Sequence, residues 1–211
     1  MSSDEKPLTT DVAPLAIPVG EPAVLEEVLA SEKNLVENVR LVEWMTLPAS
    51  ETHPDVLEFL NLWNLRDPIY VDYQDVGEGY RPDFCHVSVK HVALNRGGRR
   101  IHGWALWQFS QGGVDVIVAD FHSVWETPDG VLVDVTLPKD GNKVLFVRDP
   151  ELVITRVGNV QRLYNNRTNV PDAPRLWNGN PTGEEFFGMP DDQPSLVAYC
   201  AQLGLPNTSM E

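Results

Sequence analysis

The sequence predicts an α+β fold in which N-terminal helices pack on an antiparallel β-sheet. Apolar residues recur at helical spacing mainly before residue 96, whereas strand-like alternation follows between residues 101 and 157. Helices that precede a run of strands with short connections are typical of α+β domains. Strand and helix patterns do not alternate along the chain, which argues against a parallel, doubly wound sheet.

The chain of 211 residues is long enough for one domain with a buried core. Residues 1–21 are rich in Pro, Thr, Ser and acidic residues without a periodic apolar pattern, so we expect a disordered tail. Residues 22–211 are expected to form a single domain, with a core at about residues 54–157 and an irregular C-terminal extension at 158–211.

Helix signals occur three times in the N-terminal half. Pro22 and Pro54 each stand at the first position of an amphipathic pattern, where proline is favoured. Asp83 is expected to cap a third helix, which Gly97 ends. We therefore expect helices at residues 22–34, 54–65 and 84–95, a strand at 39–45, and a loop at 66–83.

After residue 98 the pattern changes to strands. The sequence Thr127-Pro128-Asp129-Gly130 predicts a tight turn, with proline at its second position and a glycine able to adopt positive φ. Residues 165–194 are rich in Asn, Pro and Gly. We expect strands at residues 101–109, 114–125, 131–137, 143–147 and 152–157, and a final helix at 195–203.

The net charge of −15 argues against direct binding to nucleic acid or to anionic membranes, because no basic surface is available to neutralise phosphates. Two cysteines in a chain of this size favour free thiols in a reducing compartment. No apolar run has membrane-spanning length, and the N-terminus lacks a secretory signal pattern. We expect a cytoplasmic protein, and export of an effector through the N-terminal tail stays open. The oligomeric state is not predicted.

One cysteine, one histidine and one aspartate lie in an order that is typical of a cysteine nucleophile. Cys85 stands near the start of a predicted helix, where unpaired backbone N–H groups favour a thiolate. His122 lies on a predicted strand, and Asp134 lies on the next one. A thiol, an imidazole and a carboxylate that orients the imidazole are the three parts of a catalytic triad.

The turn between the last two strands decides whether His122 and Asp134 can meet. A three-residue loop with Gly130 in the left-handed region places Thr127 opposite Val131 and His122 opposite Thr136. Asp134 is then the diagonal neighbour of His122 on the same face, at roughly 7–8 Å between backbone atoms. A two-residue loop would place the two side chains on opposite faces. The turn sequence favours the three-residue loop.

The segment His122-Ser-Val-Trp-Glu-Thr-Pro-Asp-Gly-Val-Leu-Val-Asp134-Val-Thr136 resembles the transglutaminase-like branch of the papain-like superfamily. In that branch a histidine strand precedes a turn and a strand ending in Val-Asp-x-Thr, and arylamine N-acetyltransferases carry a similar arrangement. The resemblance covers about residues 80–140. It implies a papain-like core and a catalytic domain in which Cys85 is the nucleophile, His122 the general base and acid, and Asp134 the residue that orients His122.

The resemblance implies acyl transfer from a carboxamide of a protein or peptide substrate, that is, amide hydrolysis, deamidation or transamidation without a cofactor. The sequence departs from the family pattern at His86, which follows the nucleophile where tryptophan or a small residue is common. Gln74 and Tyr80 are the candidate oxyanion-hole side chains, beside the backbone N–H of Cys85. Candidate walls of a substrate cleft are Trp104, Trp107 and Trp125, for which core packing is the alternative.

Other interpretations of the same residues stay open. Cys85 could be a small buried apolar residue, His122 a core histidine, and Asp134 a loop-organising residue. A non-catalytic acidic binding or effector module on a papain-like scaffold would have a similar sequence. A zinc site is a further alternative, although two of its candidate residues lie five positions apart on one predicted helix and no Cys-x-x-Cys pair is present. The candidate zinc ligands are Cys85, His86, His91, His102 and His122.

Overall fold

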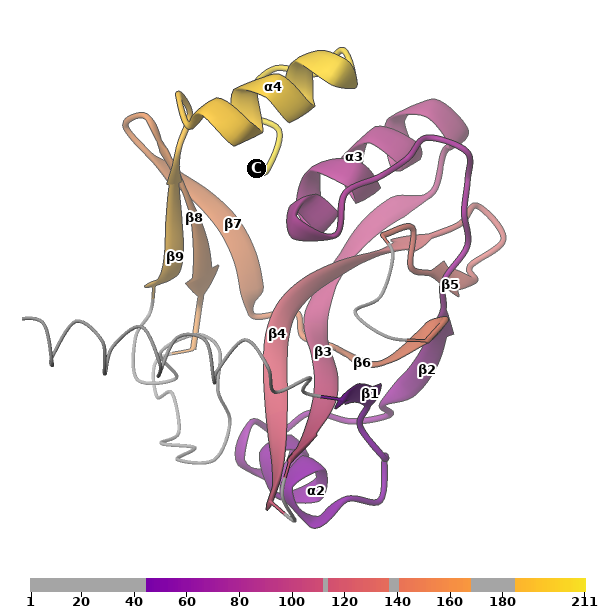
Figure 1. Cartoon of the computed structure of the whole chain (residues 1–211). Helices are drawn as coiled ribbons and strands as arrows, with labels where there is room; N and C mark the ends of the chain where they lie inside the picture. Colours follow the sequence, from indigo (N-terminus) through magenta and orange to yellow (C-terminus); the bar gives the residue numbers. More distant parts are fainter. Residues whose placement is uncertain (1–44, 112–113, 137–140, 168–184) are drawn as a thin grey trace, which may run out of the picture. The chain divides into compact units, whose positions relative to one another are not determined.

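The computed structural model describes residues 45–111, 114–136, 141–167 and 185–211 (Figure 1). The expected tail at residues 1–21, the expected helix at 22–34 and nearly all of the expected strand at 39–45 lie outside these residues.

The described residues form an α+β structure with three α-helices and two antiparallel sheets. The expected fold class is therefore confirmed at this level. The helices are α2 (Pro54–Leu62), α3 (Cys85–Arg96) and α4 (Pro194–Gln202), and a single 3₁₀ turn, η1 (Pro82–Phe84), leads directly into α3.

The larger sheet has six strands in the order β2-β6-β3-β4-β5, with β1 paired to β3 beside β6. Its two ends nearly meet, because the Asp134 backbone N–H after β5 donates to the Asp72 carbonyl of β2 over 3.0 Å. A parallel bridge between Tyr73 and Asp134 continues this closure. The strands are β1 (Met45–Pro48), β2 (Ile69–Asp72), β3 (Arg99–Gln111), β4 (Val114–Glu126), β5 (Leu132–Val133) and β6 (Lys143–Arg148).

The long hairpin of β3 and β4 supports two of the helices (Figure 1). Near one end, Phe59 and Trp63 of α2 pack edge-on against Trp104 of β3. At the other end α3 lies on both strands, and its buried Val89 and Val92 belong to the same core cluster as Trp125 of β4. The N-terminus of α3 is thereby held against the hairpin.

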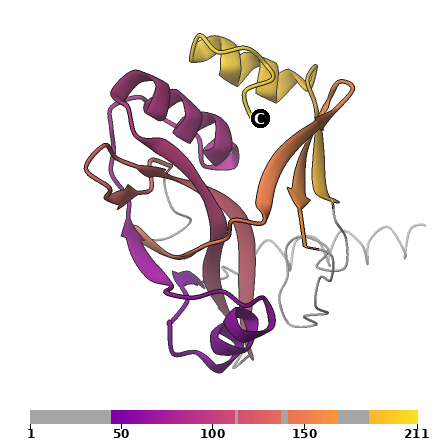
Figure 2. The ribbon, with the colours of Figure 1, turned by 180° about the vertical axis from the view of Figure 1, so that it is seen from behind.

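The smaller sheet has the order β7-β8-β9 and carries α4 at one end in both views (Figure 2). Leu196 of α4 and Leu163 of β8 share a core cluster with the residues of α3. A buried hydrogen bond of 2.8 Å joins Ser88 of α3 to Tyr199 of α4. The strands are β7 (Leu152–Val157), β8 (Val160–Asn165) and β9 (Glu185–Pro190).

Most of the predicted elements are present with small changes in their ends. The helix expected at 84–95 is α3, but the expected cap is wrong. Phe84 occupies the N-cap position and makes no side-chain cap, while Asp83 lies in η1 and faces Arg81 at 4.0 Å. The 3₁₀ turn moves the start of the α-helix past Asp83.

One strand prediction and one loop prediction need correction, and two further strands were not predicted. The strand expected at 131–137 is only the two-residue β5, because the Asp134 carboxylate accepts hydrogen bonds from the Thr136 N–H and hydroxyl and turns the chain. The loop expected at 66–83 contains β2, in which only Val71 is buried. Strands β8 and β9 were not predicted. Strand β2 has only four residues, and two of the three buried positions of β8 are the polar Gln161 and Asn165, so neither shows apolar alternation. Strand β9 lies in the segment rich in Asn, Pro and Gly.

Candidate active site

Cys85 is the first residue of α3, directly after the 3₁₀ turn. No side chain caps this helix terminus, so no carboxylate competes for the positive end of the helix dipole. Both cysteines of the chain are free and buried, and Cys200 lies on α4 in a core cluster.

His122 and Asp134 are in direct contact. His122 Nε2 lies 2.9 Å from Asp134 Oδ2 in a contact that is almost buried. The other carboxylate oxygen of Asp134 accepts hydrogen bonds from the Thr136 N–H at 2.9 Å and the Thr136 hydroxyl at 2.8 Å. The carboxylate is therefore held on both oxygens, and the Nδ1 side of the His122 ring is left free for another partner.

The predicted hairpin register is confirmed for the pairs beside the turn, although the pairing ends at Val133 and does not extend to Thr136. Trp125 pairs with Val133 and Glu126 with Leu132, and the Thr127 N–H donates to the Val131 carbonyl over 2.9 Å. Gly130 has a φ of 82°, as the three-residue loop requires. In this register His122 and Asp134 share a face, and the turn of the chain at Thr136 completes their approach.

The charges of Cys85 and His122 stabilise each other. Burial by itself raises the pKa of the Cys85 thiol, but attraction to His86 and His122, with hydrogen bonding to both rings, lowers that pKa well below its usual value. Burial likewise lowers the pKa of His122, but Asp134 and Cys85 raise it well above its usual value. Each of the two groups therefore favours the charged form of the other.

Access to this pair is limited. Cys85 is 7% exposed, and the His122 side chain is 14% exposed while that of Asp134 is 2% exposed. The exposed part of the group lies mainly on the His122 ring. The carboxylate is shielded from water, which strengthens its interaction with the imidazolium.

A second polar group at the thiol was not predicted from the sequence. His86, the residue after Cys85, has its Nδ1 2.6 Å from the buried hydroxyl of Ser123. The same hydroxyl lies 2.8 Å from Nδ1 of His102. Arg100 donates to the His86 carbonyl over 3.1 Å. Burial, together with the charges of Arg100 and His86, lowers the pKa of His102 to about 2, so this ring is neutral.

The structure gives other contacts for the two oxyanion-hole candidates. The Tyr80 hydroxyl is 2.7 Å from Nδ1 of His91. His91 is six residues after Cys85 in α3, which corresponds to roughly 9 Å along the helix axis. The Gln74 residue is exposed, and its backbone N–H donates to the Asp134 carbonyl over 2.8 Å.

All three tryptophans considered as cleft walls are buried in the core. Trp104 donates from Nε1 to the buried carboxylate of Asp149 over 2.8 Å. Trp107 packs in the cluster between the strands of the larger sheet, and Trp125 donates from Nε1 to the Gly97 carbonyl over 2.9 Å. Their main role is to fill the core and fix the end of α3.

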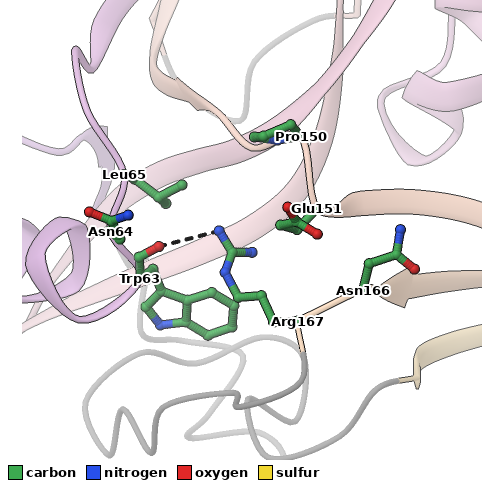
Figure 3. Close-up of a pocket in the computed structure, with 7 residues that line it drawn as sticks. All are labelled: Trp63, Asn64, Leu65, Pro150, Glu151, Asn166 and Arg167. Atoms are coloured by element: carbon green, nitrogen blue, oxygen red, sulfur yellow. Dashed lines mark hydrogen bonds between the residues drawn. The ribbon is translucent and has the colours of Figure 1, made fainter.

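A pocket of about 430 Å³ lies elsewhere on the described residues, beside the end of α2 (Figure 3). The Arg167 guanidinium lies over the Trp63 ring at 5.2 Å and forms an ion pair with Asp149 at 2.7 Å. None of Cys85, His122 and Asp134 lines this pocket. Its lining residues are Trp63, Asn64, Leu65, Pro150, Glu151, Asn166 and Arg167.

Within the described ranges, no cluster of three or more His, Cys, Asp or Glu side chains has the geometry of a metal site. Among the candidate zinc ligands, His91 instead contacts Tyr80 and Asn95. No helix among the residues that the structure describes is both long and apolar enough to cross a bilayer.

Comparisons with protein-family models, with curated proteins and with solved structures give no match to this chain.

Proposed function

We propose that this chain is a cysteine-dependent acyl-transfer enzyme that acts on carboxamides of protein or peptide substrates. Cys85 is the nucleophile, His122 the general base and acid, and Asp134 the residue that orients His122. The proposal includes a papain-like arrangement of the helix that bears the cysteine and the strand that bears the histidine. A nucleophilic thiol must remain reduced, which favours a compartment such as the cytoplasm.

One observation carries the proposal. A thiol at a helix N-terminus interacts with an imidazole whose far nitrogen contacts a buried carboxylate at 2.9 Å. The three groups come from α3, β4 and the segment after β5, so no local sequence effect explains why they meet. A structural role would not require a thiol with a lowered pKa, whereas a nucleophile does.

The chemistry follows from the protonation states. The Cys85 thiolate adds to the carbonyl carbon of a carboxamide and forms a carbon–sulfur bond, and the carbonyl electron pair moves to the oxygen. His122 then gives its Nδ1 proton to the departing nitrogen, and the carbon–nitrogen bond breaks to leave a thioester on Cys85. Water or a second amine, deprotonated by His122, attacks the thioester and restores the thiol.

The first test is alkylation of the intact chain with iodoacetamide across a range of pH. Because its pKa is lowered, Cys85 is expected to be alkylated faster at neutral pH than an ordinary thiol of the same exposure. An unperturbed thiol has only about 3% thiolate at pH 7. Cys200, whose pKa is raised mainly by burial, should react slowly until the pH is well above neutral. Mass spectrometry of the two cysteine peptides measures both rates in one sample.

Equal and slow labelling of the two cysteines would contradict the proposal and favour a non-catalytic binding module. Cys85→Ala is the control, since it should remove the fast-labelled peptide and leave Cys200 labelling unchanged. Slow labelling of Cys85 with the pH profile of an ordinary thiol would also contradict the proposal.

The second test is acylation by p-nitrophenyl acetate, which transfers an acetyl group to a reactive thiol without a specific substrate. We expect acetyl-Cys85 to form and to be lost faster when a primary amine is added. His122→Ala should reduce acylation by about 10²–10⁴-fold, because the base and the imidazolium are both removed. Unchanged acylation in a folded His122→Ala protein, checked by circular dichroism, would show that His122 has no catalytic role.

A further inference from the structure

A second chain of hydrogen-bonded side chains leads to Cys85. It runs from His102 on β3, through Ser123 on β4, to His86 in the first turn of α3. The Ser123 hydroxyl oxygen is 2.6 Å from His86 Nδ1 and 2.8 Å from His102 Nδ1. Ser123 is fully buried and His86 is 6% exposed, so bulk water does not compete for these hydrogen bonds.

The number of hydrogens in this chain is limited. A serine hydroxyl has one hydrogen, so Ser123 donates to one Nδ1 atom and accepts a hydrogen from the other. If Ser123 donates to His86, the hydrogen of a neutral His86 ring is on Nε2. If Ser123 donates to His102, His86 carries a hydrogen on Nδ1, and Nε2 carries one only when the ring is a cation.

A thiolate at Cys85, which the proposed function requires, selects among these arrangements. Since Nδ1 of His86 is occupied by Ser123, Nε2 is the ring nitrogen left to meet the sulfur of Cys85. A lone pair on Nε2 would repel the thiolate, whereas an N–H there stabilises it. Both arrangements that the thiolate tolerates, the neutral and the cationic, therefore have a hydrogen on Nε2. The neutral His102 can serve Ser123 as donor or as acceptor.

We propose that His86 is a catalytic residue of the acyl transfer described above, and that its Nε2–H is the side-chain donor of the oxyanion hole. In the resting state this N–H points to the Cys85 sulfur. The Ser123–His102 pair fixes the His86 ring and keeps the hydrogen on Nε2. This assignment rests on the proposed function, because an oxyanion forms only if Cys85 attacks a carbonyl.

The position of the donor matches the place where charge develops. When the sulfur adds to a carbonyl carbon, the new oxyanion is two bonds away from the sulfur, so a donor that already contacts the sulfur can reach it. The Tyr80 hydroxyl is engaged with His91, and Gln74 is exposed. His86 therefore takes the role that the sequence assigned to those two residues.

The test compares two reactions of Cys85 in His86→Gln, Ser123→Ala and the unchanged chain. Alkylation by iodoacetamide needs a thiolate and no oxyanion donor, whereas acylation by p-nitrophenyl acetate needs both. Each rate is taken at its high-pH plateau, where the thiol is fully ionised in every variant. We expect acylation by the Ser123→Ala protein to fall about 10-fold or more and alkylation to stay within about 3-fold, because loss of an oxyanion donor costs roughly 10²–10³-fold.

His91→Gln is the matched control, since it removes another histidine of α3 that contacts Tyr80 and Asn95, and both of its rates should be unchanged. Ser123→Ala keeps the His86 ring and serves if His86→Gln does not fold. ¹⁵N shifts of the labelled His86 should report a hydrogen on Nε2 in the unchanged chain and a mixture of tautomers in Ser123→Ala.

Equal losses in acylation and alkylation, or no loss in either, would overturn the assignment of His86. That result differs from failure of the proposed function, in which the unchanged chain itself shows neither fast alkylation nor acylation at Cys85.

Discussion

The two carboxylate oxygens of Asp134 have different partners. Oδ1 accepts hydrogen bonds from the Thr136 N–H and hydroxyl, and this ends β5. Oδ2 contacts His122 Nε2 at 2.9 Å and contributes to the raised pKa of the imidazole. Because the carboxylate is held by Thr136, its position does not depend on His122.

Asp134→Asn separates the roles of these two oxygens. The amide oxygen can still accept from Thr136, so the fold should be kept. The amide N–H₂ would then donate to His122 Nε2. The neutral His122 ring would therefore carry its hydrogen on Nδ1, on the side of the Cys85 sulfur. We expect the p-nitrophenyl acetate acylation rate to fall roughly 10²–10⁴-fold, because His122 is left in the wrong tautomer to accept the thiol proton.

The same variant changes the pH dependence of alkylation. Loss of the carboxylate charge lowers the His122 pKa, because the Asp134 carboxylate is one of the groups that raise it. A less charged His122 stabilises the Cys85 thiolate less, so the midpoint of iodoacetamide labelling should move to higher pH. A labelling profile unchanged in Asp134→Asn would show that Asp134 does not control the charge on the pair.

At the scale of single residues, the sequence predicted the groups that follow from local rules. Parity along a hairpin and the chemistry of one turn were sufficient to place His122 beside Asp134. The contacts among His86, Ser123 and His102 depend on how α3 lies on β3 and β4, and no local pattern encodes that packing. The only sequence signal was that Ser123 follows His122 directly and His86 follows Cys85.

At the scale of elements, the β3–β4 hairpin is the frame of the candidate site. It carries His102, Ser123 and His122, and its register brings Gly103 directly opposite His122. The sequence predicted both strands closely because each is a long run rich in branched and aromatic residues that is bounded by glycine or proline turn signals. Strand β2 was missed because its single buried residue, Val71, gives no alternation. The pairing partner decides the structure of such a short edge strand.

Gly103 is the point at which this frame is most sensitive to substitution. A Cβ atom there would overlap the Val147 carbonyl oxygen and the Phe146 ring of β6. We expect Gly103→Ala to lower the free energy of unfolding by about 1–3 kcal/mol, the usual cost of an overpacked core, because the backbone oxygen cannot move without disturbing β6. Urea denaturation followed by tryptophan fluorescence measures this change.

Gly130→Ala is a useful comparison for that measurement. Gly130 has a φ of 82° with open space around its Cβ position, so only backbone strain is added. We expect a cost of about 1 kcal/mol. A Gly103→Ala protein as stable as the unchanged chain would mean that β3 and β6 lie further apart than the structure places them.

At the scale of the whole described region, residues after α4 return to the start of α3. Arg100 of β3 donates to the carbonyls of both His86, at 3.1 Å, and Met210, at 2.7 Å. Gln161 of β8 holds the same segment: its Oε1 accepts from the N–H groups of Met210 at 2.8 Å and Glu211 at 3.2 Å. Residues that the sequence assigned to an irregular extension thus complete the surroundings of the cysteine helix.

Gln161→Leu tests how much this connection stabilises the molecule. Gln161 is fully buried, and its Nε2 donates to the Asp191 carboxylate at 3.0 Å and the Asn207 carbonyl at 2.8 Å. Leucine fills a similar volume, but it leaves the hydrogen-bond partners of the Gln161 side-chain oxygen and nitrogen unsatisfied. We expect the free energy of unfolding to fall by about 2–4 kcal/mol, because each buried polar group left unsatisfied costs about 1–3 kcal/mol and some will reach water.

The exposed Gln202, at the end of α4, provides the control, since Gln202→Leu should change the free energy of unfolding by less than about 0.5 kcal/mol. If the segment after α4 supports the start of α3, Gln161→Leu should also change the alkylation rate of Cys85 under conditions in which the protein is still folded, and Gln202→Leu should not. A Gln161→Leu protein that loses stability but keeps the Cys85 rate would show that the contacts of Gln161 with the segment after α4 do not affect the thiol.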